Sequence, residues 1–255
     1  MCKLSKAFDV AQNLVLSSLR PADLEHLLPD LQPVTLPLGK VVYEPGERIG
    51  HCYFPTSSVI SLQCSMRDGA TAEMGMVGKE GVLGVIPFLG GESICSMAIV
   101  AVAGGSLRLP AKRLQQEFLR PGPLQQLLLR YTMAHITQVS QTAVCNRLHS
   151  VEQRLCRLLL LCHDRTNRAE LPMTQELIAS MLGGRRESVT LAAGRLQDAG
   201  LIHYCRGRIL ILNRAGLEAA ACECYRAVED ESDRLFGRTR QPGFSKAATA
   251  FQAAC

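Results

Sequence analysis

Residues 174–202, TQELIASMLGGRRESVTLAAGRLQDAGLI, decide the fold of the C-terminal part of the chain. Apolar residues recur at helical spacing over 175–182 and again over 185–199, and Gly183-Gly184 interrupts the pattern between them. Thr174 is a residue type that caps a helix start through its hydroxyl oxygen. The stretch therefore predicts two helices joined by a tight turn, with one side of the pair buried.

The sequence on either side of this pair completes a larger pattern. A helix is expected at 151–164, where VEQRLCRLLLLCHD supplies an apolar face for the pair to pack against. Two β-prone runs at 201–204 and 208–212 flank Cys205-Arg206-Gly207, which predicts a small hairpin with a basic tip. Three helices followed by such a hairpin are the pattern of a winged helix-turn-helix.

Positive charge is concentrated on this motif rather than spread along the chain. The whole chain has a formal net charge of only +5. Between residues 185 and 214, six arginines oppose two acidic residues, which leaves +4. Over 215–233 one arginine opposes six acidic residues, so we expect a solvated acidic helix there. The focused charge favours a polyanionic partner for the motif.

The second helix of the pair has the residues that a helix in the major groove of DNA requires. Its N-terminal half is polar, and its apolar residues lie on the opposite face. Arg186 is suited to a bidentate contact with guanine, Glu187 to a cytosine amino group, and Ser188 or Thr190 to a base or phosphate. The predicted contact set is Thr174, Gln175, Arg185, Arg186, Glu187, Ser188, Thr190, Arg195, Arg206 and Arg208.

Residues 34–110 are predicted to form a series of short strands. Turn signals, namely Glu44-Pro45-Gly46, Asp68-Gly69 and Gly104-Gly105, separate them. Asp68-Gly69 is a strong hairpin signal, because glycine tolerates the positive φ that such a turn needs. The expected strands lie at 41–43, 52–54, 59–64, 72–77 and 99–102. Many short strands predict a β barrel or sandwich of the jelly-roll kind, preceded by helices at 14–19 and 21–31.

One long helix is expected after Pro123, because apolar residues recur three or four apart over about 26 residues. At 1.5 Å per residue it would be about 39 Å long. An apolar seam of that length favours packing against the same helix of a second copy, although burial within its own domain is the alternative. The predicted dimer residues are Leu124, Leu128, Tyr131, Ile136 and Val139.

The chain resembles the bacterial Crp/Fnr family of transcription regulators over residues 15–225. The resemblance rests on Glu44-Pro45-Gly46-Glu47, on Cys52-Tyr53-Phe54, on the central helix and most specifically on 174–202. It implies an α+β fold with an N-terminal β jelly-roll of the cyclic-nucleotide-binding kind, a long central dimerisation helix and a C-terminal winged helix-turn-helix. The expected division is a sensor domain at 1–120, the helix at 121–149, the DNA-binding domain at 150–237 and a mobile tail at 238–255.

The resemblance also implies a function. It predicts a cytoplasmic homodimer that binds a near-palindromic site in double-stranded DNA, with RNA polymerase as a further candidate partner. In the family an Arg-Glu pair reads base edges at the positions that match Arg186 and Glu187. The sequence departs from many members at Thr190-Leu191, where a further base-reading residue would stand, which leaves the operator sequence open.

The sensory half lacks one residue that cyclic-nucleotide binding needs. By resemblance, Glu80 matches the glutamate that holds the ribose hydroxyl. Cys95-Ser96 stands where an Arg-Ser pair would hold the phosphate, and no arginine occurs between Arg67 and Arg108. The candidate pocket is Gly78, Lys79, Glu80, Gly81, Cys95 and Ser96. We therefore expect weak cyclic-nucleotide binding and an unknown effector.

No cofactor or metal is predicted from the sequence. Only Cys2 precedes residue 50, no CxxC pair occurs, and no histidine has a distinctive haem context. Cys222-Glu223-Cys224 keeps a thiol redox sensor as an alternative, and His149, one helical turn after Cys145, is attributed to chance. A non-DNA-binding interaction module is the other alternative. No catalytic motif, apolar membrane run or secretion signal is found, so neither an enzyme nor a membrane protein is expected.

Overall fold

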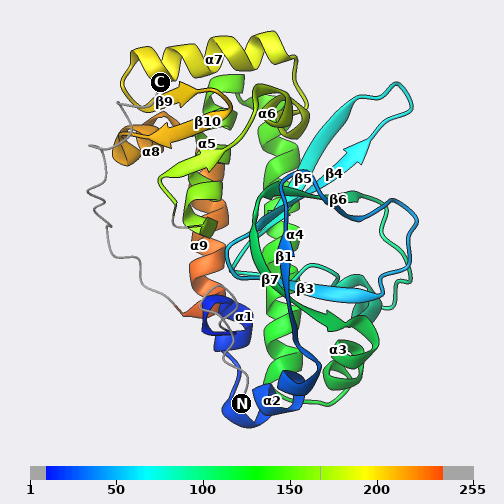
Figure 1. The fold of residues 1–255 in the computed structure, drawn as a ribbon. Coiled ribbons are helices and arrows are strands. Elements are labelled where there is room, and N and C mark those ends of the chain that lie inside the picture. The colour runs from blue at the N-terminus through cyan, green and yellow to red at the C-terminus, as the bar shows by residue number, and fades with distance from the viewer. Residues whose placement is uncertain (1–9, 167, 238–255) are drawn as a thin grey trace.

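A computed structural model describes residues 10–166 and 168–237. The expected tail at 238–255 lies outside these residues. Two antiparallel sheets form the N-terminal half, with strand orders β1-β7-β3 and β2-β6-β4-β5 (Figure 1). Their strands are β1 (Gln32–Leu36), β2 (Val41–Tyr43), β3 (His51–Pro55), β4 (Val59–Ser65), β5 (Thr71–Val77), β6 (Met97–Val102) and β7 (Gly104–Pro110).

Helices surround this β domain and build the rest of the chain. Those before and directly after the sheets are α1 (Leu14–Ser17), α2 (Pro21–Leu27) and α3 (Ala111–Phe118). The long helix is α4 (Pro123–Leu148), followed by α5 (Val151–Thr166). The C-terminal part contains β8 (Glu170–Pro172), α6 (Gln175–Leu182), α7 (Arg186–Asp198), β9 (Ile202–Cys205), β10 (Arg208–Ile211), α8 (Arg214–Ala220) and α9 (Cys224–Phe236). This is the α+β class expected from the sequence.

The hairpin predicted at Asp68-Gly69 is confirmed. β4 and β5 pair antiparallel around it, and Gly69 has a φ of +84°. The Asp68 carboxylate accepts a hydrogen bond from the backbone N–H of Ala70 at 3.0 Å, which fixes the turn. Glycine and aspartate thus each have the role that their turn chemistry predicts.

The expected turn at Gly104-Gly105 is wrong, because both glycines lie inside β7. They pair with Leu36 and Thr35 of β1, a strand that the sequence pattern did not reveal. A Cβ on Gly104 would lie 2.5 Å from the backbone of Ser57, so this position requires glycine for close approach of two chain segments. The Ser57 hydroxyl accepts the N–H of Gly105 at 2.9 Å. Close packing of β7 against the segment at Ser57, rather than a reversal of chain direction, explains the two glycines.

The break between α4 and α5 is encoded by a capping box. His149 is extended, and Ser150 and Gln153 exchange hydrogen bonds: the Ser150 N–H donates to Gln153 Oε1 at 3.1 Å, and the Gln153 N–H donates to Ser150 Oγ at 3.3 Å. The chain therefore begins a new helix at Val151 instead of prolonging α4. This junction separates the long helix from the C-terminal domain.

The charge pattern predicted one solvated acidic helix at 215–233, and this prediction is wrong. The segment divides into α8 and α9, and α9 packs antiparallel to α4 (Figure 1). At one end Gln141 contacts Cys224, and at the other Arg130 Nη2 donates to the carbonyl of Leu235 at 3.2 Å. Buried residues such as Tyr225 give α9 an apolar side that the acidic residues conceal in the sequence.

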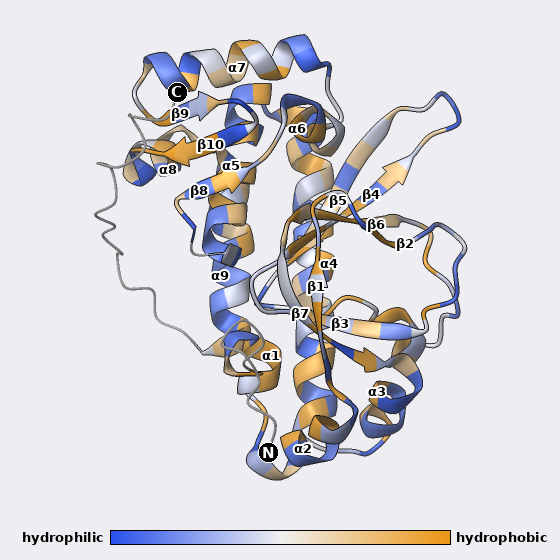
Figure 2. Ribbon diagram, in the orientation of Figure 1, coloured by the Kyte–Doolittle hydropathy of each residue, from blue (hydrophilic) through white to orange (hydrophobic). Residues whose placement is uncertain are grey.

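Apolar residues form two main buried clusters, one within the β domain and one around α5, α6 and α7. In Figure 2, hydrophobic and hydrophilic residues alternate along the whole of α4, which contacts the β domain on one side. Among the helices of the described chain, none is long and apolar enough to cross a bilayer.

A buried carboxyl group of the β domain lies within electrostatic range of two arginines of α5. Glu73 of β5 is 6% exposed and accepts a hydrogen bond from the Ser61 hydroxyl at 2.6 Å. Burial raises its pKa to about 7, although Ser61, Arg157 and Arg165 act in the opposite direction. At neutral pH this carboxyl group of the folded protein is therefore only about half ionised.

We expect Glu73→Gln to stabilise the protein more at pH 8 than at pH 5. Burial of Glu73 costs little while its carboxyl group is neutral. The free energy of unfolding of the wild type therefore falls as the pH rises from 4.5, the ordinary pKa, towards about 7, whereas a glutamine at this position does not titrate. The full difference corresponds to roughly 3 kcal/mol. Thermal unfolding at both pH values tests this, with exposed Glu44→Gln as the control. An equal change in Tm at both pH values would contradict the expectation.

Candidate functional site

The two helices predicted at 174–202 are present, and local chemistry sets their ends. The Thr174 hydroxyl accepts the N–H of Leu177 at 3.1 Å and begins α6. Gly183 ends α6 with a φ of +58°, a left-handed conformation that favours glycine. Arg185 is the extended residue before α7. The sequence thus encodes both the turn and the direction of the second helix.

One face of α7 is buried and the other is open. Val189, Ala192 and Leu196 pack in the cluster that includes Leu155 and Leu159 of α5. The opposite face points outwards at one end of the molecule, far from α1 and α2 (Figure 1). This face is free to enter a groove.

A hairpin follows α7, as the sequence predicts. β9 and β10 pair so that Cys205 lies opposite Arg208, which leaves Arg206 and Gly207 as a two-residue loop. Both have positive φ values, +46° and +76°. Loops of this kind match the twist of a hairpin. The exposed Arg206 therefore stands at the tip of a wing.

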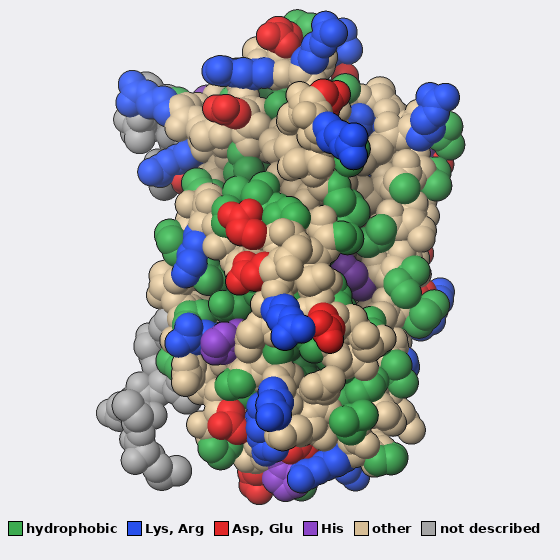
Figure 3. Space-filling view, turned by 90° about the vertical axis from the view of Figure 1, so that its right-hand side faces the viewer, with side chains coloured by type: hydrophobic (Ala, Val, Ile, Leu, Met, Phe, Trp, Pro, Cys, Tyr) green, Lys and Arg blue, Asp and Glu red, His purple; other side chains and the backbone are tan. Residues whose placement is uncertain are grey.

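The structure divides the predicted cations into paired and unpaired groups. Arg195 lies 3.6 Å from Glu152, and Arg208 lies 3.0 Å from Glu170. Over residues 10–166 and 168–237, no ion pair involves Arg185, Arg186 or Arg206, and all three are exposed. Figure 3 shows basic side chains projecting at the end of the molecule where Figure 1 places α7.

The predicted polar residues are arranged around the start of α7. The Thr190 hydroxyl contacts Gln175 Oε1 at 3.0 Å and the carbonyl of Arg186 at 3.0 Å, which ties α7 to α6. Glu187 is exposed and Ser188 is half-buried. Leu191 is 66% exposed on the same open face. Leu191 is absent from the predicted contact set, because an apolar residue in a helix more often faces the core.

Glu80 lies in a small cavity between the β domain and the C-terminal helices, but its ligand is already a residue of this chain. Arg165 of α5 donates from Nε to Glu80 Oε1 at 2.8 Å, and the N–H of Gly78 donates to the same oxygen at 3.1 Å. Arg165 also contacts Gln138 Oε1 at 2.9 Å and the carbonyl of Leu161 at 3.2 Å. The carboxylate that should hold an effector therefore holds α5.

Arg165 is the cation that the sequence did not place in this pocket. Only 5% of its side chain is exposed. Burial opposes its charge, but the carboxylates of Glu80 and Glu229 raise its pKa above the ordinary value. Nothing local signals this contact, because 85 residues separate Arg165 from Glu80.

The cavity beside this pair has a volume of about 30 Å³, room for about two water molecules. Its walls come from β5 and the loop after it, from α4 and α5, and from α9: Met76, Glu80, Tyr131, Ala134, His135, Gln138, Arg165, Val228, Ser232 and Leu235. Of the predicted pocket residues, only Glu80 belongs to these walls. Cys95 is exposed elsewhere, and Ser96 is buried without lining the cavity.

The loop that contains Lys79 is packed tightly against the same helices. A Cβ on Gly78 would lie 2.6 Å from Arg165, and one on Gly81 would lie 2.4 Å from Tyr131. These glycines allow the loop to approach α4 and α5 closely.

The predicted dimer residues fall on different faces of α4. Leu124, Leu128 and Tyr131 are buried in the core of the same chain, and Val139 is half-buried against β5. Ile136 is 49% exposed. It belongs to an exposed apolar stripe, here called the α4 stripe, which consists of Leu129, Met133, Ile136, Val144 and Leu148.

Comparison with known proteins identifies the domain that contains α6 and α7. Residues 153–220 match the Crp-like helix-turn-helix domain. The global nitrogen regulator of Synechocystis sp. (strain ATCC 27184 / PCC 6803 / Kazusa) is 22% identical over 192 residues, which cover 72% of this chain and 85% of that protein.

Solved structures share the fold. FixK2 from Bradyrhizobium japonicum superposes with a TM-score of 0.65 at 15% identity, covering 75% of this chain and 98% of that one. A transcriptional regulator of the CRP family from Thermus thermophilus gives a TM-score of 0.62 at 18% identity, covering 74% and 96%. Residues 153–220 therefore form a Crp-like helix-turn-helix domain, and the described chain shares the α+β fold of solved Crp/Fnr-type regulators.

Proposed function

We propose that the protein binds a near-palindromic DNA site as a homodimer and reads bases with the N-terminal half of α7. The observation that carries this proposal is the group of unpaired guanidiniums, Arg185, Arg186 and Arg206, at the end of the molecule where α7 is open. Arginine without an internal partner is available for guanine or phosphate. Two such helices would contact successive major-groove faces about 34 Å apart.

The remaining predicted residues have different parts in this interface. Arg186, Glu187 and Ser188 are candidates for base edges, because they lie in the first turn of α7. Leu191 is suited to a thymine methyl group, since it is an exposed apolar side chain on the same face. Arg206 at the wing tip is suited to a phosphate.

We expect Arg186→Ala and Arg206→Ala to weaken DNA binding in different ways. Loss of a bidentate base contact should cost about 1–3 kcal/mol on the preferred site and relax base preference. Loss of a phosphate contact should weaken all sequences alike and reduce the salt slope by about one. Fluorescence anisotropy with a duplex selected from a random library, against a scrambled duplex, measures both effects.

Arg48→Ala is the matched control for these variants, because Arg48 is an exposed β-domain arginine paired with Glu92. Its affinity for both duplexes should equal that of the wild type. The division between base and phosphate contacts fails if Arg186→Ala and Arg206→Ala lower affinity for the selected and scrambled duplexes by the same factor.

The α4 stripe supports the dimer. Its members lie three or four residues apart, except for a gap of eight residues between Ile136 and Val144 where Ser140 occupies the intervening position. Their exposed fractions lie between 45% and 71%. The α9 helix packs on α4 without covering them. Burial of this stripe against a second copy would remove apolar surface from water.

We expect Ile136→Glu to dissociate the dimer and to lower DNA affinity, because a carboxylate buried at the seam would lack a partner. Sedimentation velocity at micromolar concentration measures the oligomeric state. Gln116→Glu makes the same change of charge at an exposed position of α3 and should leave the dimer intact. A wild type that sediments as a monomer yet binds a palindrome tightly would overturn this part of the proposal.

We infer that cyclic nucleotides are not the effector. Glu80 is paired with Arg165, and the cavity of about 30 Å³ is far smaller than a nucleotide. Opening it would break the ion pair and move α9 away from α4. Breaking the pair would leave Arg165 and Glu80 each without the opposite charge, and an unpaired buried charge has a large free-energy cost.

Cyclic AMP and cyclic GMP should bind at least about a hundredfold more weakly than they bind a pocket with a phosphate-binding arginine. Titration calorimetry with both nucleotides tests this, with a cyclic-nucleotide-binding protein measured in parallel as the positive control. Low-micromolar binding that also changes DNA affinity would show that Arg165 leaves Glu80 and serves as the missing phosphate contact.

A further inference from the structure

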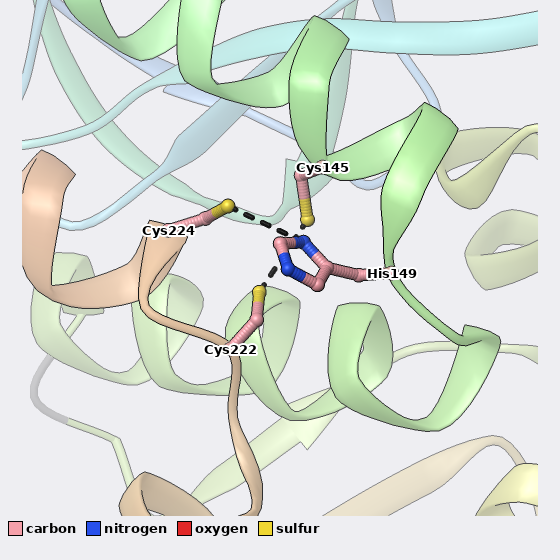
Figure 4. Close-up of side chains that lie close together, drawn as sticks. All are labelled: Cys145, His149, Cys222 and Cys224. Atoms are coloured by element: carbon pink, nitrogen blue, oxygen red, sulfur yellow. Dashed lines mark hydrogen bonds between the residues drawn. The ribbon is translucent and has the colours of Figure 1, made fainter.

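Four potential metal ligands from two distant segments converge beside the junction of α4 and α5. Cys145 lies in the last turn of α4, and His149 follows one turn later. Cys222 and Cys224 lie between α8 and the start of α9. Their ligand atoms all lie within 4.8 Å of one another, and Figure 4 shows the four side chains pointing towards a common centre.

The distances within this cluster fit a tetrahedral metal site. Cys145 Sγ lies 3.5 Å from Cys222 Sγ, and Cys224 Sγ lies 3.4 Å from His149 Nδ1. With Zn–S bonds of about 2.3 Å and Zn–N bonds of about 2.0 Å, the edges of a tetrahedron are about 3.8 Å for S–S and about 3.5 Å for S–N. A small adjustment would therefore bring all four atoms into the coordination shell.

The three cysteines of the cluster are closed to solvent and separate from both apolar cores, and the His149 side chain is 14% exposed. Cys145 and Cys224 are 0% exposed and Cys222 is 4% exposed. These three cysteines form a buried group of their own rather than part of the leucine-rich clusters. Structural zinc sites are closed in the same way, with four protein ligands and no open position.

Neighbouring side chains provide an outer shell of the kind that supports such a site. His149 Nε2 lies 3.4 Å from a Glu223 carboxylate oxygen, which leaves Nδ1 directed at the cysteines. The Gln141 side-chain amide donates to Cys224 Sγ at 3.2 Å. A carboxylate behind a histidine fixes its tautomer and orientation for metal binding.

Two arginines of α5, Arg154 and Arg157, interact electrostatically with the thiol of Cys145. Arg157 is 7% exposed, and its Nη2 donates to the Thr142 hydroxyl at 2.7 Å. Arg154 donates to the carbonyl of Leu182. The Nε atoms of both are buried without a hydrogen-bond partner, and no carboxylate in the described part of the chain forms an ion pair with either side chain. Zinc with three thiolates and one imidazole has a net negative charge, which these guanidiniums would balance.

We propose that Cys145, His149, Cys222 and Cys224 bind one Zn²⁺ ion, which fastens the end of the long helix to the C-terminal domain. Thiolate and imidazole ligands in a tetrahedral arrangement favour zinc over the hard cations. The ligands lie on both sides of the helix-turn-helix and its wing in the sequence. Metal binding therefore holds that domain against α4, and it does not depend on whether the proposed DNA contacts are correct.

The test begins with the full-length wild-type protein purified under reducing conditions without a chelator. Elemental analysis should find about one zinc per chain. After removal of the metal, Co²⁺ should produce the intense d–d and thiolate charge-transfer absorption of a tetrahedral sulfur-rich site. Zn²⁺ should then displace Co²⁺, and its addition should raise the Tm.

Variants separate this site from the other thiols. Cys222→Ser combined with Cys224→Ser should abolish the Co²⁺ spectrum, whereas Cys64→Ser, a thiol of β4, should retain it. Glu223→Gln keeps all four ligands and should weaken zinc binding about 10–100-fold. Glu223 is exposed, so this variant tests the site even if the double cysteine variant fails to fold.

Three outcomes would overturn the proposal. One is the absence of stoichiometric zinc together with no tetrahedral Co²⁺ spectrum. Another is an unchanged spectrum in a folded double cysteine variant. The third is a disulfide between Cys145 and Cys222 in freshly purified protein, found by mass spectrometry, which would make the cluster a redox pair. Because none of these measurements involves DNA, they remain informative if the DNA proposal fails.

Discussion

The buried ion pair between Arg165 and Glu80 is the contact on which the arrangement of the two halves depends. A buried pair is tolerated only when further hydrogen bonds satisfy both ions. Gln138 and the carbonyl of Leu161 do this for Arg165, whereas Glu80 receives the N–H of Gly78 on Oε1 and its buried Oε2 has no hydrogen-bond partner. Because both ions are desolvated, either one alone would be costly, so the pair fixes α5 against the β domain. The helix-turn-helix packs on α5 and is positioned with it.

Local signals in the sequence predicted the parts of the fold that local chemistry determines. The cap at Thr174, the turn at Gly183 and the hairpin at Asp68-Gly69 are each set by a few neighbouring residues. Gly104-Gly105 shows the limit of this reasoning. A turn and a close approach of two segments need the same residue type, and only the partner segment at Ser57 distinguishes them.

Residues that depend on distant partners escaped prediction for a common reason. The long helix has apolar residues on several sides, so periodicity alone did not separate Leu128, which faces its own core, from Ile136, which is exposed. The metal cluster is similar, since Cys145 and Cys224 belong to segments far apart in the chain. Cys145 and His149, like Cys222 and Cys224, have a spacing that indicates no metal site by itself, and the two pairs meet only because α9 folds back along α4.

The same dependence on distant partners changes what the charge of the DNA-binding segment means. A count along residues 185–214 includes six arginines, but Arg195 and Arg208 are paired with Glu152 and Glu170, which lie before that segment. Arg214 is likewise paired, with Asp164 of α5. Three arginines of the six therefore have no carboxylate partner in the described part of the chain. In the proposed DNA complex these three need give up no internal ion pair, whereas Arg195 and Arg208 would exchange weak surface pairs for phosphate contacts.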